Sequence, residues 1–332
     1  MDIIELEKNL RKHDHKEEIL EYVKNLNKKE VPVIFDNIHL ARLININEDQ
    51  FFSVLFSPKN HMTTFSIPKK RNGKREISKP SPVLMHCQRW ILDNILYKLK
   101  AHHKAKGFKK NISIVDNAKE HINKEYVLNI DIKDFFKNIN NKKVFILFKS
   151  IGYSEKVSLT LSNLCTFNNY LPQGAPTSPH ISNLILIKLD NRIEAYAQKN
   201  NLTYTRYADD ITLSGSKEVY KSIKVISEIL NDEGFEIKKE KTRVQPYYSR
   251  QEVTGLVVND KVSVPKEYIK QLRQELYYIR TRGMENHLTF NDKFFVSNYR
   301  EYILGKINFL KMVDSKKGNF YLNEFLEIWD KR

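Results

Sequence analysis

The stretch YTRYADDITLS, residues 204–214, places two adjacent aspartates between two runs of β-forming residues. Tyr, Thr, Ile and Leu favour strands, and the short Ala208-Asp209-Asp210 segment predicts a tight turn between them, so the stretch indicates a β-hairpin. A solvated turn is the ordinary interpretation of an isolated Asp-Asp pair. Here both flanking strands are apolar and aromatic, which puts the turn at the end of a packed sheet, where two carboxylates are costly unless a cation binds them.

A third carboxylate follows another apolar strand. Residues 126–130 read YVLNI and lead directly into Asp131. Carboxylate oxygens with no His or Cys beside them favour Mg²⁺ or Mn²⁺ and argue against zinc. Two such ions about 3.5–4 Å apart would hold both the attacking and the leaving oxygen of a phosphoryl displacement. The three aspartates therefore predict nucleotidyl transfer.

Positive charge is concentrated in one segment. The chain of 332 residues carries a formal charge of +16, and residues 59–110 hold 14 Lys and Arg against 2 acids, a net +12. Such a run is usually a solvated face. Within it, IPKKRNGKREISKP (67–80) predicts a hairpin that turns at Asn72-Gly73, with basic side chains around its tip. We therefore expect a polyanionic partner whose binding weakens steeply with salt.

Composition excludes several classes of protein. The chain is 41% hydrophobic and 11% aromatic, enough for a folded core, and its length suggests two or three domains. The longest apolar runs, such as 144–148, are far too short to span a membrane, and MDIIELEKNL at the start is not a secretory signal. Cys87 and Cys165 cannot form a disulfide framework or a four-ligand zinc site. We expect a cytoplasmic protein.

Hydrophobic periodicity predicts an ordered series of elements from residue 126 to 245. The expected order is a strand, helices, the hairpin, a helix and a final strand, which is close to a split βαβ sheet with helices on one face. The expected ranges are strand 126–132, helices 142–148, 154–165 and 181–200, the hairpin strands 202–207 and 211–214, helix 217–233 and strand 235–245. Further helices are expected in 1–30, twice in 31–57, from Pro82, and from 265 onward.

Six motifs occur in a characteristic order over roughly residues 59–260. They are IPKKRNGKREISKP (67–80), NIDIKDFF (129–136), LPQGAPTSPHISN (171–183), YTRYADDITLS (204–214), GFEIKKEKT (234–242) and EVTGLVV (252–258). With them the chain resembles a reverse transcriptase, and more closely a bacterial retron reverse transcriptase. NAKEH (117–121) fits the NAxxH element of retron enzymes, and Val253-Thr254-Gly255 fits their VTG triplet.

The resemblance implies an α+β right-hand polymerase with fingers, a palm built on a split βαβ sheet, and a helical thumb. The implied domains are an N-terminal helical region (1–58), the fingers and palm (59–250), and the VTG element with the thumb (251–332). The thumb segment 261–332 has a net charge of +5, from 14 Lys and Arg against 9 acids, which suits an RNA duplex.

The resemblance also implies a reaction and its partners. Retron enzymes copy their cognate noncoding RNA into multicopy single-stranded DNA from dNTPs, priming from a guanosine 2′-hydroxyl to give a 2′,5′-branched RNA–DNA. They belong to antiphage defence systems with a separate effector protein, and no membrane is involved. A group II intron-like reverse transcriptase is one alternative. A catalytically idle RNA-binding protein is another, against which the intact aspartates argue.

Residue roles follow from the matched motifs. Asp131, Asp209 and Asp210, with the backbone carbonyl of Ile132, would bind two Mg²⁺ ions, for which Mn²⁺ is an alternative. Lys241 would protonate the departing pyrophosphate, although a surface lysine is an alternative.

Two further groups of residues would bind the nucleotide and the RNA. Lys69, Arg75, Phe136 and Gln173 would bind the incoming nucleotide. Phe136 would exclude a 2′-hydroxyl, unless it is a simple core residue. Asn117, His121, Val253, Thr254 and Gly255 would contact RNA, with a structural role left open for Asn117 and His121.

Overall fold

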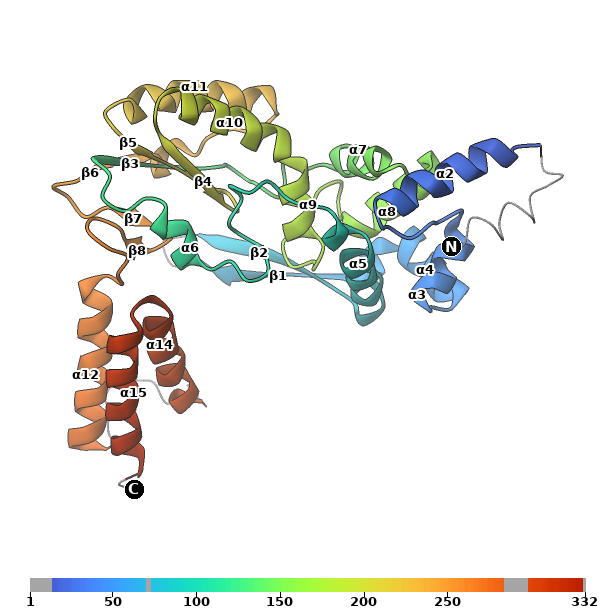
Figure 1. The fold of residues 1–332 in the computed structure, drawn as a ribbon. Helices are drawn as coiled ribbons and strands as arrows, with labels where there is room; N and C mark the ends of the chain where they lie inside the picture. Colours follow the sequence, from blue (N-terminus) through green and yellow to red (C-terminus); the bar gives the residue numbers. More distant parts are fainter. Residues whose placement is uncertain (1–13, 70–72, 284–297, 331–332) are drawn as a thin grey trace.

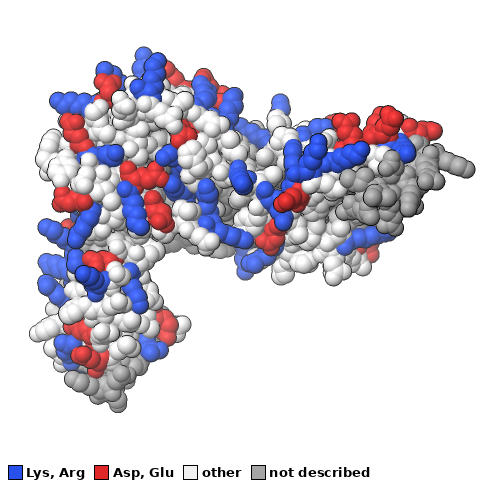
Figure 2. Space-filling model, viewed as in Figure 1, with Lys and Arg blue, Asp and Glu red and all other residues white. Residues whose placement is uncertain are grey.

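The computed structural model describes residues 14–69, 73–283 and 298–330. A four-stranded sheet with helices over one face lies toward the end of the molecule that carries the C-terminal helices, and a two-stranded sheet lies nearer the middle (Figure 1). A group of C-terminal helices projects from one end, so that the molecule is L-shaped with a hollow on its inner side (Figures 1 and 2). This arrangement confirms the expected fingers, palm and thumb architecture.

The helices follow the hydrophobic pattern of the sequence. Those before and within the fingers are α2 (Lys16–Lys28), α3 (Asn37–Ile44), α4 (Glu48–Phe56), α5 (Pro82–Asn94) and α6 (Ile114–Lys119). Those of the palm are α7 (Asn141–Ile151), α8 (Glu155–Cys165), α9 (Ser178–Ile185), α10 (Ile187–Lys199) and α11 (Val219–Asp232). Those of the thumb are α12 (Lys266–Arg282), α14 (Tyr299–Val313) and α15 (Ser315–Asp330). Short 3₁₀ turns occupy Pro58–His61, Leu96–Lys98 and Lys239–Lys241.

The palm sheet carries the candidate site at one end. Its strands are β3 (Tyr126–Asp131), β4 (Thr203–Tyr207), β5 (Asp210–Gly215) and β6 (Arg243–Pro246), all antiparallel and in the order β4-β5-β3-β6. Helices α10 and α11 lie over one face (Figure 1). The central strand β3 pairs with β5 in a register that sets Asp131 opposite Asp210. The split βαβ prediction is confirmed, and it brings together acids 79 positions apart in the sequence.

The fingers sheet is the predicted basic hairpin. Strands β1 (Met62–Pro68) and β2 (Lys74–Pro80) pair antiparallel, with Ile67 opposite Arg75. The predicted turn at Asn72, together with Lys70 and Arg71, lies outside the described residues. The structure therefore confirms both strands and leaves the tip of the hairpin as a prediction.

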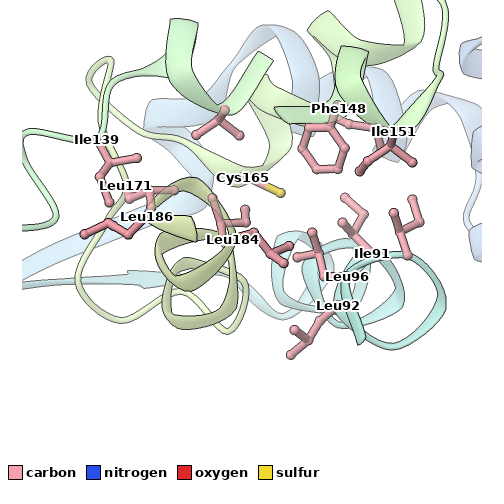
Figure 3. Packing of buried hydrophobic residues seen from close by; sticks show 14 of the residues in the cluster. Ile91, Leu92, Leu96, Ile139, Phe148, Ile151, Cys165, Leu171, Leu184 and Leu186 are labelled. Carbon is pink, nitrogen blue, oxygen red and sulfur yellow. The ribbon is translucent and has the colours of Figure 1, made fainter. Parts of the chain in front are cut away.

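One hydrophobic core runs from the N-terminal helices into the palm. It joins residues of α2–α4, such as Leu26 and Phe51, to palm residues as far along the chain as Phe235. Figure 3 shows part of this core, where Cys165 lies among Phe148, Leu184 and their neighbours. Both cysteines are buried and free. Because the first helices and the palm share a core, the predicted boundary at residue 58 is not a gap in packing.

A second core unites the thumb with one edge of the palm. The strands β7 (Glu252–Val253) and β8 (Leu256–Val257) form a small hairpin whose Val253 and Leu256 pack with the thumb helices. Ala118 of α6 and Val127 of β3 belong to the same core. Phe295, which we expected in a thumb helix, lies outside the described residues.

Two expected elements differ in the structure. The helix expected over 181–200 is broken at Leu186, where ψ is 5°, and the chain restarts as α10 with the Asp190 amide donating to the Leu186 carbonyl. The strand expected over 235–245 is shorter, because a 3₁₀ turn at residues 239–241 interrupts it before β6. In both places the break is a local change in the backbone that the hydrophobic pattern does not reveal. No helix in the described ranges has the length and hydropathy of a membrane span.

Candidate active site

Three aspartates converge where β3 ends and the β4–β5 hairpin turns. Asp131 is the last residue of β3, and Asp210 opens β5 directly opposite it. Asp209 lies in the turn, and its carbonyl accepts a hydrogen bond of 2.9 Å from the Ile132 amide. The Ile132 side chain is buried, so that only the backbone of this residue is available to the site.

Burial and neighbouring negative charge raise the pKa of two of the three carboxylates, Asp209 and Asp210. Burial first, and then the charge of Asp131, raises the pKa of Asp209. Burial, followed by the charges of Asp209 and Asp131, raises the pKa of Asp210 to about 7, even though part of this side chain is open to solvent. Concentrated negative charge of this kind favours a bound cation, which removes the repulsion.

Lys241 partly balances these charges. Its Nζ donates to Oδ2 of Asp131 at 2.5 Å, and the 3₁₀ turn at residues 239–241 brings it there. Although burial alone would lower it, the hydrogen bond and charge of Asp131 raise the pKa of Lys241, which is therefore protonated near neutral pH. The structure places the Lys241 ammonium group at the carboxylates, although part of its side chain is exposed.

A divalent cation fits this set of groups. Oxygen donors are the ligands that Mg²⁺ prefers, and burial together with the neighbouring aspartates raises the pKa values of Asp209 and Asp210, which a bound cation would lower again. A different group, His102, His103 and Glu194, has ligand atoms within 4.8 Å of one another in the described part of the chain. There Nδ1 of His102 accepts the Lys104 amide at 3.3 Å, so Nε2 carries the proton and faces Oε2 of Glu194 at 3.3 Å. We interpret these three side chains as a structural hydrogen-bonded group and not as a metal site.

The raised pKa of Asp210 has a consequence for stability. Because the folded-state pKa of about 7 exceeds the unfolded value near 3.8, the metal-free protein loses stability as pH rises from about 4 to 7. Asp210→Asn removes this loss. We expect its melting temperature in EDTA at pH 8 to exceed the parent's by about 2–4 °C, a small shift because Asp210 is partly solvated. At pH 4 the two proteins should melt together; a constant difference at both pH values would contradict the assignment.

Of the residues expected to bind a nucleotide, Arg75 lies close enough to the carboxylates for its charge to act on Asp209. Lys69 and Arg75 are exposed on the fingers hairpin. Gln173 follows α8 in the LPQG turn, and its carbonyl accepts the Ser78 amide at 2.9 Å. This bond ties the turn to strand β2. The Gln173 turn and the fingers hairpin are therefore packed together.

Gly174 allows this close approach. Its φ is +134°, and a Cβ at this position would lie 2.7 Å from the Ser78 carbonyl oxygen. Gly174→Ala should lower the free energy of unfolding by about 1–3 kcal/mol, through backbone strain and the contact with β2. Gly255→Ala is the matched control, because Gly255 also has a positive φ but nothing within 4 Å. Equal losses of denaturant stability in the two variants would contradict the role of the contact.

The adjacent residues Phe135 and Phe136 differ in how deeply they are buried. Phe135 is buried in the first core, whereas Phe136 is only partly buried and packs at its margin. The centroids of the Phe108 and Phe136 rings are 6.2 Å apart. Phe108 follows Gly107, which packs against Ala208 in the turn that carries Asp209. Phe136 therefore keeps part of its ring exposed, whereas Phe135 takes the core position.

The two NAxxH residues lie in the interior, which corrects their expected contact with RNA. Asn117 and His121 are both 0% exposed, so neither side chain has surface to offer a nucleic acid. His121 accepts or donates hydrogen bonds to Ser214 at 2.6 Å and Thr205 at 2.8 Å, and burial lowers its pKa to about 3. A neutral His121 thus fastens α6 to strands β4 and β5. The structural alternative fits these side chains.

The VTG residues form the turn between β7 and β8. Val253 is buried in the thumb core, whereas Thr254 and Gly255 turn the chain with positive φ values of 49° and 81°. Gly255 is exposed. Contact with RNA at this triplet can therefore involve Thr254 and Gly255 but not the Val253 side chain.

Sequence reasoning missed Arg206 and Asp190. Both side chains are 0% exposed and form an ion pair of 2.7 Å. Arg206 also contacts the Ala208 carbonyl in the turn that carries Asp209. The signal was an arginine inside an otherwise uncharged strand, since a buried charge requires a partner.

A split βαβ palm, a carboxylate trio at the end of its central strand, and a basic fingers hairpin together define a right-hand nucleic-acid polymerase. The family model described as reverse transcriptase (RNA-dependent DNA polymerase) matches residues 67–259. Retron Ec86 reverse transcriptase of Escherichia coli is 37% identical over 289 residues, covering 85% of this chain and 86% of that protein. Retron Mx162 reverse transcriptase of Myxococcus xanthus is 34% identical, covering 81% of this chain and 61% of that one.

The chain belongs to the retron reverse transcriptases. It is therefore an RNA-directed DNA polymerase, a class that works with an RNA template and generally with divalent metal ions. Among solved structures, telomerase from Candida albicans aligns with 83% of this chain and 62% of its own at 11% identity, with a TM-score of 0.47.

Proposed function

We propose that this chain copies a cognate noncoding RNA into multicopy single-stranded DNA, beginning from a guanosine 2′-hydroxyl and leaving a 2′,5′-branched RNA–DNA. The observation that carries the proposal is the pairing of Asp131 with Asp210 beside Asp209, in a chain that shares 37% identity with a retron reverse transcriptase. The relatives' retron identity supports the self-priming reaction. A role in antiphage defence, with a separate effector protein, belongs to the same proposal.

The site residues would divide the reaction among themselves. Asp131, Asp209 and Asp210, with the Ile132 carbonyl, would hold two Mg²⁺ ions or, as an alternative, Mn²⁺. Such ions stabilise the developing charge on the attacking and leaving oxygens. Arg75 and Lys69 would bind the triphosphate, Gln173 would lie beside the sugar, and Phe136 would exclude a 2′-hydroxyl.

Lys241 is suited to the departure of pyrophosphate. It is protonated and held at Asp131, so it can deliver a proton within the site without a separate donor. RNA contacts of Thr254 and Gly255 would lie at the thumb end of the palm. The domain boundaries at residues 58 and 250 are also part of the proposal.

The test is the chemical linkage of the product. The protein would be co-expressed with the RNA encoded beside its gene, and the nucleic acid that copurifies would be treated with RNase and with a 2′,5′-specific debranching enzyme. We expect single-stranded DNA that retains a short RNA branch, which debranching releases. A linear product, or DNA formed equally well from unrelated RNA with an annealed primer alone, would overturn the self-priming proposal.

A further inference from the structure

Arg206 is a fully buried arginine three residues before Asp209 in the chain. It is one of the largest side chains with no exposed surface. Its Nε and Nη2 donate to the two carboxylate oxygens of Asp190, each at 2.7 Å, in a bidentate pair. Burying such a pair is costly, and replacing it with apolar side chains often leaves a fold equally stable. Stability alone is therefore a poor reason for placing an arginine here.

The remaining nitrogen of Arg206 binds the catalytic turn. Nη1 donates to the carbonyl of Ala208 at 3.0 Å and to Oδ1 of Asn183 at 3.1 Å. Ala208 has a φ of 58°, in the left-handed region that residues other than glycine seldom occupy. Its carbonyl belongs to the peptide group that joins it to Asp209. Arg206 thus fixes the orientation of the peptide group between Ala208 and Asp209, and with it the backbone that carries the Asp209 side chain.

The neighbouring carbonyl is fixed from the other side. The Asp209 carbonyl accepts the Ile132 amide of the β3 end. Two successive carbonyls of the turn are therefore held, one by the strand that carries Asp131 and one by Arg206. Because metal ligands must match the geometry of the ion closely, the orientation of these peptides affects affinity for the ion.

A loop closes the network from outside. The Arg206 amide donates to the Lys104 carbonyl at 2.9 Å, and the Arg206 carbonyl accepts the Lys106 amide at 2.7 Å. Asn183 Nδ2 donates to the Gly107 carbonyl at 2.9 Å, and a Cβ on Gly107 would lie 2.6 Å from the Ala208 nitrogen. Helices α9 and α10 therefore hold both the turn and the loop packed against it, through Asn183 and Asp190.

We propose that Arg206, held by Asp190 and Asn183, is a positioning residue that orients the Ala208–Asp209 peptide for metal binding. The inference rests on the proposed metal-binding role of Asp209 and Asp210. Arg206 has no exposed surface to offer a nucleotide or an RNA, so we expect its effect to reach the reaction through the turn.

The test combines a metal-binding measurement with steady-state kinetics. Arg206→Lys keeps the charge but replaces the three guanidinium nitrogens with a single ammonium nitrogen, so it cannot keep the bidentate bond to Asp190 and the bond to Ala208 together. In the full chain, we expect its affinity for Mn²⁺, measured by electron paramagnetic resonance, to fall about fivefold or more. In primer extension, the Mg²⁺ concentration for half-maximal rate should rise in parallel and kcat should fall about tenfold, with KM for dNTP within about twofold.

Tyr204→Phe is the matched control. The Tyr204 hydroxyl donates to the same Asp190 oxygen at 2.6 Å and is equally buried, but it does not contact Ala208. We expect this variant to lose thermal stability while its Mn²⁺ affinity stays within about twofold of the parent. Equal Mn²⁺ affinities for Arg206→Lys and the parent would overturn the proposal.

A second variant keeps the test decisive if Arg206→Lys does not fold. The double change Asp190→Leu with Arg206→Met replaces the buried pair with apolar side chains of similar volume and also removes the bond to Ala208. Folded protein with weakened Mn²⁺ binding would support the proposal, and folded protein with unchanged Mn²⁺ binding would overturn it. Absence of Mn²⁺ binding and DNA synthesis in the parent would instead refute the proposed function.

Discussion

Asp209→Asn should abolish most DNA synthesis while sparing RNA binding. The substitution removes one charge from the carboxylate trio but keeps the size of the side chain in the turn. A loss of about 3–4 kcal/mol of transition-state stabilisation corresponds to a fall in kcat of about 10²–10³ or more. Primer extension with dNTPs and Mg²⁺ measures the loss, and a filter-binding or gel-shift assay measures affinity for RNA, which we expect to change by less than about twofold.

Asp134→Asn is the control for this result. Asp134 lies three residues beyond Asp131, is exposed, and has a φ of 45°, which asparagine also tolerates. It should keep nearly full activity. Equal losses in the two variants would mean that the general charge of the region matters and that the trio has no special role. Loss of RNA binding in Asp209→Asn would contradict the separation of chemistry from binding.

Phe136→Ala should make the enzyme accept ribonucleotides. Phe136 is only partly buried, and in its proposed role beside the incoming sugar an alanine would leave space for a 2′-hydroxyl. We expect discrimination between a dNTP and the matching rNTP, expressed as the ratio of kcat/KM values, to fall by about 10²-fold, with kcat/KM for the dNTP reduced much less. Single-nucleotide extension with each substrate measures both numbers.

Phe135→Leu separates this effect from a general loosening of the core. Phe135 is 5% exposed and stacks edge-on against Phe136 at a centroid distance of 5.1 Å. Its truncation should lower the melting temperature and leave sugar discrimination within about threefold of the parent. A larger loss of discrimination in Phe135→Leu than in Phe136→Ala would assign selectivity to packing, and not to the exposed ring.

Local pattern was sufficient for most of the fold. The strand before Asp131, the hairpin at Asp209-Asp210 and the helix that starts at Pro82 all follow from periodicity and capping, and Ser81 accepts the Leu84 amide as its cap. Because these signals depend on only a few neighbouring residues, the elements that they predict are present in the structure. The convergence of the three aspartates was also readable, because each lies at the end of an apolar strand or in the turn between two, while their metal-binding role stays a prediction.

Long-range pairing was not readable from pattern. Nothing local in NAKEH tells whether His121 meets RNA or Ser214, 93 positions away. The partner of Arg206 was equally hidden, because Asp190 lies on a helix whose acids look like ordinary surface residues. The break at Leu186, which was also missed, begins the helix that carries Asp190. The misses therefore concentrate where tertiary contacts decide the role of a residue.

The central position of β3 determines when the site can assemble as the chain is synthesised. This strand, complete at Asp131, gains its two neighbours only from Asp210–Gly215 and Arg243–Pro246. Until Gly215, 84 residues beyond Asp131, has been synthesised, β3 has two unpaired edges and lacks the opposing strand that carries Asp210, and its second edge stays unpaired until Pro246. A chain that ends before Asp209 therefore lacks two of the three aspartates of the proposed metal site, and it exposes edges that promote aggregation. Truncations before residue 246 should accordingly give insoluble protein and not a weak polymerase.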